Sequence, residues 1–111
     1  MTHLVISQTW LRDGEHHVAE YLALVQRFDA FLRSQPGFVS RRLVRSLEHP
    51  NHIIHLREFD DVASYEAMTS IAEYRAQIEA LSEHVDGSAY PEGAVPREYG
   101  EILFESAPAD S

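Results

Sequence analysis

The sequence predicts a single α+β domain with the element order β-α-β-β-α-β. The chain has 111 residues, 44% of them hydrophobic, which suffices for one compact core but not for two. The spacing of apolar residues switches between the short repeat of strands and the longer repeat of helices, with Gly- and Pro-containing segments between. We expect the domain to span residues 1–105. Residues 106–111, which are small and polar, are expected to form a flexible C-terminal tail.

The first third of the chain predicts a strand and a long helix. Residues 3–10, HLVISQTW, are rich in β-forming residues and are followed by a turn at residues 11–14. Apolar residues then recur at helical spacing: Val18, Tyr21, Leu22, Val25, Phe28 and Leu32. The segment 34-SQPG-37 ends this helix, because Pro36 cannot continue it and Gly37 favours a turn.

A hairpin is predicted next. Residues 38–47 and 52–59 both have strand character, and the short connection between them favours antiparallel pairing. Either Asp60 or Asp61 is expected to cap the helix that follows.

The rest of the chain predicts helix, loop and strand. Helical spacing runs through residues 62–71 and 72–85, either unbroken or with a break near residues 69–70. Residues 86–96 contain Gly and Pro and predict a loop, and residues 97–105 predict the last strand. The complete order is the ferredoxin-like pattern, with a four-stranded antiparallel sheet covered by helices on one face.

The uncovered face of this sheet predicts a homodimer. Ile54 and Leu56 would point to that face and form an apolar patch in water. Packing two such sheets against each other around a two-fold axis would bury the patch.

Composition argues against several functions. The net charge of −9 opposes nucleic-acid binding, and the lack of cysteine excludes disulfides and thiolate sites. Neither a signal peptide nor a membrane-spanning run is evident, so we expect a cytoplasmic protein with no membrane partner. The seven histidines show no HxxxH spacing, and His52 and His55 point to opposite faces of a strand. No metal site is therefore expected.

Polar residues within the strand at 52–59 are the first functional candidates. Alternation places His55, Arg57 and Phe59 on the face that packs against the helices. The alternative is structural: His55 could be an interior histidine with a satisfied hydrogen bond, and Arg57 could pair with an acidic residue. Strand arginines such as Arg41 and Arg45 are expected to pair with acidic residues on neighbouring strands, and anion binding is the alternative role.

Two segments, 32-LRSQPGFVSRRLVRS-46 and 55-HLREFDDVASYEAMTSIAEYRAQIEAL-81, resemble the antibiotic biosynthesis monooxygenase family. The resemblance implies a dimeric α+β barrel. It also implies a cofactor-independent monooxygenase that acts on a small aromatic substrate, such as a polyketide or a quinol, with O2. The heme-degrading branch of the family is a weaker match, because its axial histidine would fall near Ala76 or Gln77.

The resemblance also implies site residues. The anthrone oxygenases of this family use Asn, Trp, Tyr and Arg at positions that fall on His55, Phe59, Tyr65 and Arg75 here. His55 would act as the base or oxyanion partner, Tyr65 would orient the substrate, and Arg75 would stabilise the anion.

Further residues are expected to line the substrate pocket: Arg57, Phe59, Phe28, Tyr74 and Trp10. Arg57 is an alternative anion-stabilising group. Tyr65 and Tyr74 could instead be core residues, and Arg75 a surface arginine paired with Glu79. Trp10 could instead pack at the dimer interface. A cofactor-free cyclase or isomerase in the same barrel, and a non-catalytic dimeric binding protein, remain alternative functions.

Overall fold

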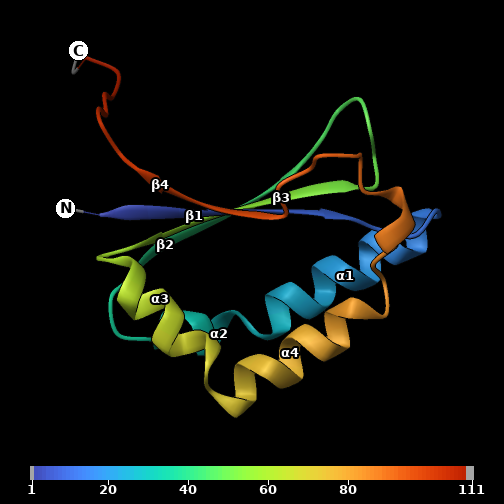
Figure 1. Ribbon diagram of the computed structural model, residues 1–111, viewed down its shortest axis with the longest axis horizontal. Helices are drawn as coiled ribbons and strands as arrows, with labels where there is room; N and C mark the ends of the chain where they lie inside the picture. Colours follow the sequence, from blue (N-terminus) through green and yellow to red (C-terminus); the bar gives the residue numbers. More distant parts are fainter. Residues whose placement is uncertain (1, 110–111) are drawn as a thin grey trace.

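The computed structural model describes residues 2–109 and confirms the predicted α+β, ferredoxin-like fold (Figure 1). The sheet is four-stranded and antiparallel, with the strand order β2-β3-β1-β4. The strands are β1 His3–Trp10, β2 Phe38–Arg45, β3 His52–Phe59 and β4 Arg97–Glu101. The helices are α1 Glu15–Arg27, α2 Asp29–Arg33, α3 Val62–Thr69 and α4 Ala72–Ser82, and a short 3-10 turn, η1, spans Gly87–Ala89. Within the described residues, no helix is long and apolar enough to cross a membrane.

The predicted long first helix is broken in two. Phe28 ends α1 with φ −93° and ψ 3°, outside the helical values, and α2 begins at the next residue. The second helical region is broken after Thr69, as one of the two predicted alternatives had it, and Ile71 is extended with ψ 136°. Each break lets a helix change direction over the sheet (Figure 1).

β4 and β2 are shorter than predicted because the strands that they pair with, β1 and β3, extend no further. β4 pairs only with β1, and His3 at the start of β1 is the partner of Glu101. Residues 102–109 have no further β1 residues to pair with, and they form no regular secondary structure. β2 ends at Arg45, whose partner Ile53 lies near the start of β3. The last two residues of the predicted tail lie outside the described part of the chain.

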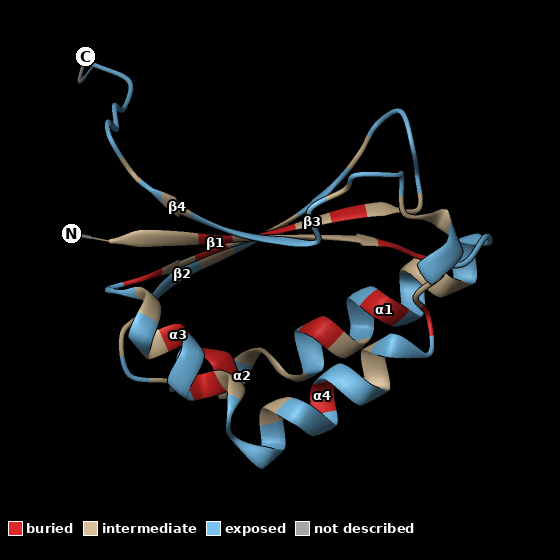
Figure 2. Cartoon of the chain, in the orientation of Figure 1, coloured by how far each residue is buried: buried red, intermediate tan, exposed pale blue. Residues whose placement is uncertain are grey.

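All the helices lie on one face of the sheet (Figure 1). Buried residues concentrate between this face and the helices, whereas the helices' outer surfaces are exposed (Figure 2). Along β3, burial alternates residue by residue, with Ile53, His55, Arg57 and Phe59 buried and their neighbours only partly buried. Alternation along β3 is therefore as predicted, and polar side chains do enter the helix-facing layer.

The turn before β2 depends on Gly37. Its φ of +81° is a conformation that residues with side chains rarely adopt, and an added Cβ would collide with the Ser64 side chain. The Gly37 carbonyl accepts a hydrogen bond from the Asp60 N–H at 2.7 Å. Asp61 then caps α3 by accepting from the Ser64 N–H at 2.7 Å, so that this turn fixes where α3 begins.

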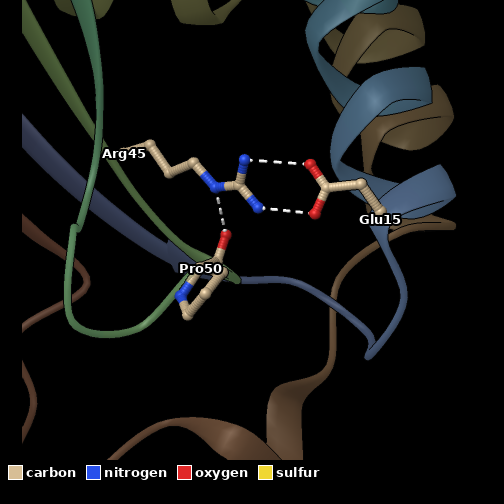
Figure 3. Close-up of polar contacts among 3 residues, drawn as sticks. All are labelled: Glu15, Arg45 and Pro50. Carbon is tan, nitrogen blue, oxygen red and sulfur yellow. Dashed lines mark hydrogen bonds and ion pairs between the residues drawn. The ribbon is translucent and has the colours of Figure 1, made fainter.

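Arginines on β2 tie the sheet to the helices rather than to other strands. Arg45 donates two hydrogen bonds, at 3.0 and 2.8 Å, to the Glu15 carboxylate and a third to the Pro50 carbonyl (Figure 3). Arg41 pairs with Asp29 at the start of α2. The expected pairing with acidic residues on neighbouring strands is therefore wrong for these two residues, since the first two helices supply the nearest carboxylates.

Candidate functional site

A cavity of about 370 Å³ lies between the sheet and the helices. Its polar lining residues are Ser7, Thr9, Tyr21, Arg41, His55, Arg57, Tyr65, Tyr74, Gln77 and Arg97. Its apolar lining residues are Val25, Phe28, Phe31, Leu32, Ile78 and Leu81. The volume and the mixture of an apolar wall with a few convergent polar groups suit a small organic ligand.

Strand register brings three of these polar residues into one row. Ser7 is the central member, because His55 of β3 is its partner on one side and Arg97 of β4 its partner on the other. Directly paired residues point to the same face of a sheet, so the three side chains enter the cavity together. Arg57 pairs with Val5 and lies two residues further along β3.

His55 is a neutral imidazole held by a tyrosine. Its Nε2 lies 2.7 Å from the Tyr21 hydroxyl, and both side chains are buried. Burial, reinforced by the positive charges of Arg57 and Arg41, lowers the pKa of His55 to about 3. Burial also raises the pKa of Tyr21, so its hydroxyl keeps its proton. Both members of this pair are therefore uncharged at neutral pH.

Arg57 is a buried cation with unused hydrogen-bonding capacity. Only 8% of the residue is exposed, and its Nη2 donates to the Ser7 hydroxyl. Its guanidinium carbon lies 5.2 Å from the centre of the Tyr65 ring, within cation–π range. Its Nε has no hydrogen-bond partner in the described structure, and the same is true of Nε2 of Gln77. Unpaired buried donors are costly, and both belong to residues that line the cavity.

Two tyrosines and Arg97 complete the polar part of the lining. The Tyr65 hydroxyl lies 3.4 Å from the Tyr74 hydroxyl and accepts from Nη1 of Arg97, also at 3.4 Å. Burial alone would raise the pKa of Tyr65, but Arg57, the hydrogen bond with Tyr74 and Arg97 together lower it below its usual value. Burial and the neighbouring Tyr65 raise the pKa of Tyr74 to about 12. Tyr65 is therefore the more acidic member of the pair.

The charge of the cavity is opposite to that of the protein. The chain carries a net charge of −9, yet none of the described residues that line the cavity is acidic. Three arginines line it, and of these Arg41 is neutralised by Asp29. The side-chain hydrogen bonds and cation–π contacts of Arg57 and Arg97 in the described structure are with hydroxyl groups and aromatic rings, and neither arginine has an acidic partner there. The cavity therefore favours a ligand that is or becomes an anion.

The structure brings five of the eight predicted site residues to this cavity: His55, Arg57, Tyr65, Phe28 and Tyr74. The other three do not line it. Arg75 is exposed on α4, because the neighbouring Tyr74 and Gln77 occupy the inward side of that helix. Phe59 is fully buried behind the cavity, packed edge-on against Phe38 and Tyr65.

Trp10 lies on the opposite face of the sheet. Ser7 and Thr9 of β1 point into the cavity, so alternation directs Trp10 away from it. There its ring stacks on His52, with ring centres 4.2 Å apart, and contacts Tyr90. Its predicted place in the pocket is not supported by this geometry.

Sequence reasoning missed Arg97, Tyr21 and Gln77 as site residues. Helical spacing predicts Tyr21 on the apolar face of the first helix, where it does lie, but its hydroxyl serves His55. Arg97 begins the last strand, and only the pairing of Ser7 with Arg97 reveals which face it occupies. A polar residue at an inward helix position, as at Gln77, is the one signal that the sequence offered.

Comparison with known proteins finds a family model that matches most of the chain. The family model described as "Antibiotic biosynthesis monooxygenase" matches residues 5–80. No curated protein matches the chain.

Several solved structures share the fold. SnoaB of Streptomyces nogalater, described as a cofactor-independent oxygenase, is 17% identical, with coverage of 97% of this chain and 98% of that one and a TM-score of 0.72. Rv0793 of Mycobacterium tuberculosis is 15% identical, with coverage of 96% and 100% and a TM-score of 0.73. A conserved protein of Methanosarcina mazei is 17% identical, with coverage of 90% and 89% and a TM-score of 0.70. At these identities the structural likeness establishes the fold alone.

Proposed function

The chain belongs to the antibiotic biosynthesis monooxygenase family, and we propose that it is a cofactor-independent monooxygenase of a small aromatic compound that reacts as an anion. The observation that carries this proposal is the cavity's electrostatics. A buried guanidinium with an unpaired N–H faces an aromatic-walled space that no acidic residue of the described lining enters. SnoaB, whose structure is similar, is described as acting without a cofactor.

The reaction requires the substrate itself to supply the electrons. A proton leaves an activated methylene group of an anthrone-like ring, giving an anion whose charge spreads over the ring and its oxygen. The anion transfers one electron to O2, and the resulting radical and superoxide combine into a peroxide. The peroxide takes up the proton and loses water, leaving a carbonyl group. Overall, the methylene carbon loses both hydrogens and gains one oxygen atom of O2, and the other oxygen atom leaves as water.

The arginines would make the first step possible. Arg57 and Arg97 stabilise the developing oxyanion and thereby lower the pKa of the substrate. Tyr65, which lies beside both guanidiniums, would donate a hydrogen bond to the same oxygen. In this scheme Arg97 takes the place that the resemblance gave to Arg75.

His55 would accept the proton. The charge of Arg57 contributes to its low pKa, and an anion bound beside Arg57 would offset that charge. His55 therefore becomes a stronger base as the substrate anion forms, and it can return the proton to the peroxide. Phe28 and Tyr74 would form walls of the pocket and exclude water.

We also propose that the protein is a homodimer joined through the face of the sheet that carries no helices. Ile6 of β1 pairs with Leu56 of β3, and Leu4 and Ile54 each lie two residues along their strands from this pair. None of the four is fully buried. Ser7 and His55 face the helices, so alternation places all four on the opposite side of the sheet, where they form an apolar patch. A second copy of the same face would cover it.

Conversion of an anthrone or hydroquinone with and without O2 tests the proposed reaction. The purified chain, freed of flavin and metal, should form the quinone in air and none under anaerobic conditions. Turnover without O2 would instead support a cyclase or isomerase that uses the same groups. Failure of any aromatic anion to bind in the cavity would leave a binding role for other ligands and would overturn the proposal.

A further inference from the structure

A second group of ligating side chains lies outside the cavity. His17 and Glu20 are one turn apart on α1, and His84 follows the end of α4. One donor atom from each of the three residues lies within 4.8 Å of the other two. The two Nδ1 atoms are 3.1 Å apart, and Nδ1 of His84 lies 3.6 Å from a Glu20 carboxylate oxygen.

The backbone fixes the position of His84. Its carbonyl accepts a hydrogen bond from the Arg12 N–H at 2.9 Å, and the next residue, Val85, forms a bridge with Leu11. The Asp86 N–H donates to the Trp10 carbonyl, also at 2.9 Å. His84 is only 9% exposed. Its imidazole is therefore held against α1 rather than free in solvent.

The separation of the two nitrogens suits a shared ion. Zinc binds histidine nitrogen at about 2.0–2.1 Å, which places two nitrogens of one tetrahedral ion about 3.4 Å apart and two adjacent nitrogens of an octahedral ion about 2.9 Å apart. The observed 3.1 Å lies between these values. In the absence of an ion the same distance fits one N–H···N hydrogen bond, so the pair is preformed in either state.

We propose that His17, Glu20 and His84 bind a divalent first-row transition-metal ion such as Zn²⁺, which fastens α1 to the end of α4. Two imidazoles and one carboxylate select such an ion over Ca²⁺ or Mg²⁺, which prefer oxygen ligands. Glu20 is 59% exposed, so water can complete the coordination.

The site is separate from the proposed oxygenase chemistry but joins the same helices. Tyr21 and Leu81 line the cavity, whereas His17 and His84 do not. A metal bound between the start of α1 and the end of α4 would stabilise the layer that covers the cavity without contacting a substrate. The test of metal binding therefore does not depend on whether the protein turns over a substrate.

Calorimetric titration of the untagged full chain with Zn²⁺ tests the site. We expect one high-affinity Zn²⁺ per chain. His17→Gln and Glu20→Gln should each weaken it by more than about tenfold, since even loss of an outer-shell partner costs about 10- to 100-fold. His49→Gln is the control, because His49 is exposed in the β2–β3 connection and belongs to no such group in the described residues.

Thermal unfolding gives a second measurement of Zn²⁺ binding, and this measurement does not rely on a single variant. Zn²⁺ should raise the Tm of the wild type and of His49→Gln and should raise that of His17→Gln and Glu20→Gln by much less. Because Glu20 is on the surface, its substitution leaves the fold intact even if His17→Gln does not. Equal Zn²⁺ affinity and equal Tm shifts in wild type and Glu20→Gln, or weakening by His49→Gln to the same extent, would overturn the proposal.

Discussion

The Tyr21 hydroxyl lies 2.7 Å from Nε2 of His55, and this contact joins α1 to β3 within the interior. Tyr21→Phe would leave a buried imidazole nitrogen without its partner. We expect a loss of about 1–3 kcal/mol in the free energy of unfolding, measured by urea titration. Tyr99→Phe serves as the control, because Tyr99 is 42% exposed, and it should change the stability by far less. Equal effects of the two substitutions would contradict a structural role for the contact.

The low pKa of His55 predicts a stability that falls in mild acid. The unfolded chain takes up a proton on this imidazole near its ordinary pKa of about 6.5, whereas the folded chain does so only near 3. Between these values the unfolded state binds more protons, so stability decreases as the pH falls.

From pH 7 to pH 5 this one group should cost about 2 kcal/mol of unfolding free energy. His55→Gln, which cannot titrate, should lose correspondingly less than the wild type over the same interval, as measured by urea unfolding at both pH values. His49→Gln should behave as the wild type does, since His49 is exposed. A wild-type pH dependence that survives in His55→Gln would contradict the assignment.

Arg57 and Arg97 should carry anion binding and turnover. Replacing either by Gln removes a charge-assisted hydrogen bond to the substrate anion, and kcat/KM should fall about 10- to 100-fold. Arg33→Gln is the matched control, because Arg33 is exposed at the end of α2 and does not line the cavity. A larger loss at the exposed Arg75 than at Arg97 would favour the assignment drawn from the family resemblance.

A charge placed on the helix-free face of the sheet should separate the proposed dimer. Leu56→Arg would bury an unpaired guanidinium in the apolar interface, which is strongly unfavourable. We expect a monomer by light scattering at concentrations where the wild type is a dimer. Leu22→Arg, on the helix side and 41% exposed, should leave the dimer intact. A monomeric wild type would refute the interface.

Alternation in β3 was visible in the sequence because every residue of that strand follows the same two-residue repeat. His55 and Arg57 stood out for the same reason, since polar residues at buried strand positions break an otherwise apolar pattern. The helix break at Phe28 was not visible, because Phe28 continues the apolar spacing and its backbone angles depend on how α2 packs.

Most of the site residues that the sequence did not reveal are brought together by contacts between segments that lie far apart in the chain. Ser7 and Arg97 meet because β1 and β4 pair, and their separation in the chain gives no sign of it. The group formed by His17 and His84 is hidden for the same reason, since these residues are 67 positions apart in the chain. Trp10 is a natural candidate for the pocket because it is the chain's only tryptophan. The alternation of side chains along β1 instead places it on the other face of the sheet.

Turnover of an anthrone under 18O2 tests the central proposal most directly, namely that an aromatic anion held by Arg57 and Arg97 is oxidised by O2 without a cofactor. The proposal predicts that the wild type, free of flavin and metal, places one labelled oxygen atom in the new carbonyl group. Arg57→Gln should slow the labelling with the turnover, and Arg33→Gln should not. A carbonyl oxygen drawn from water, or product formed at the same rate without O2, would contradict the account.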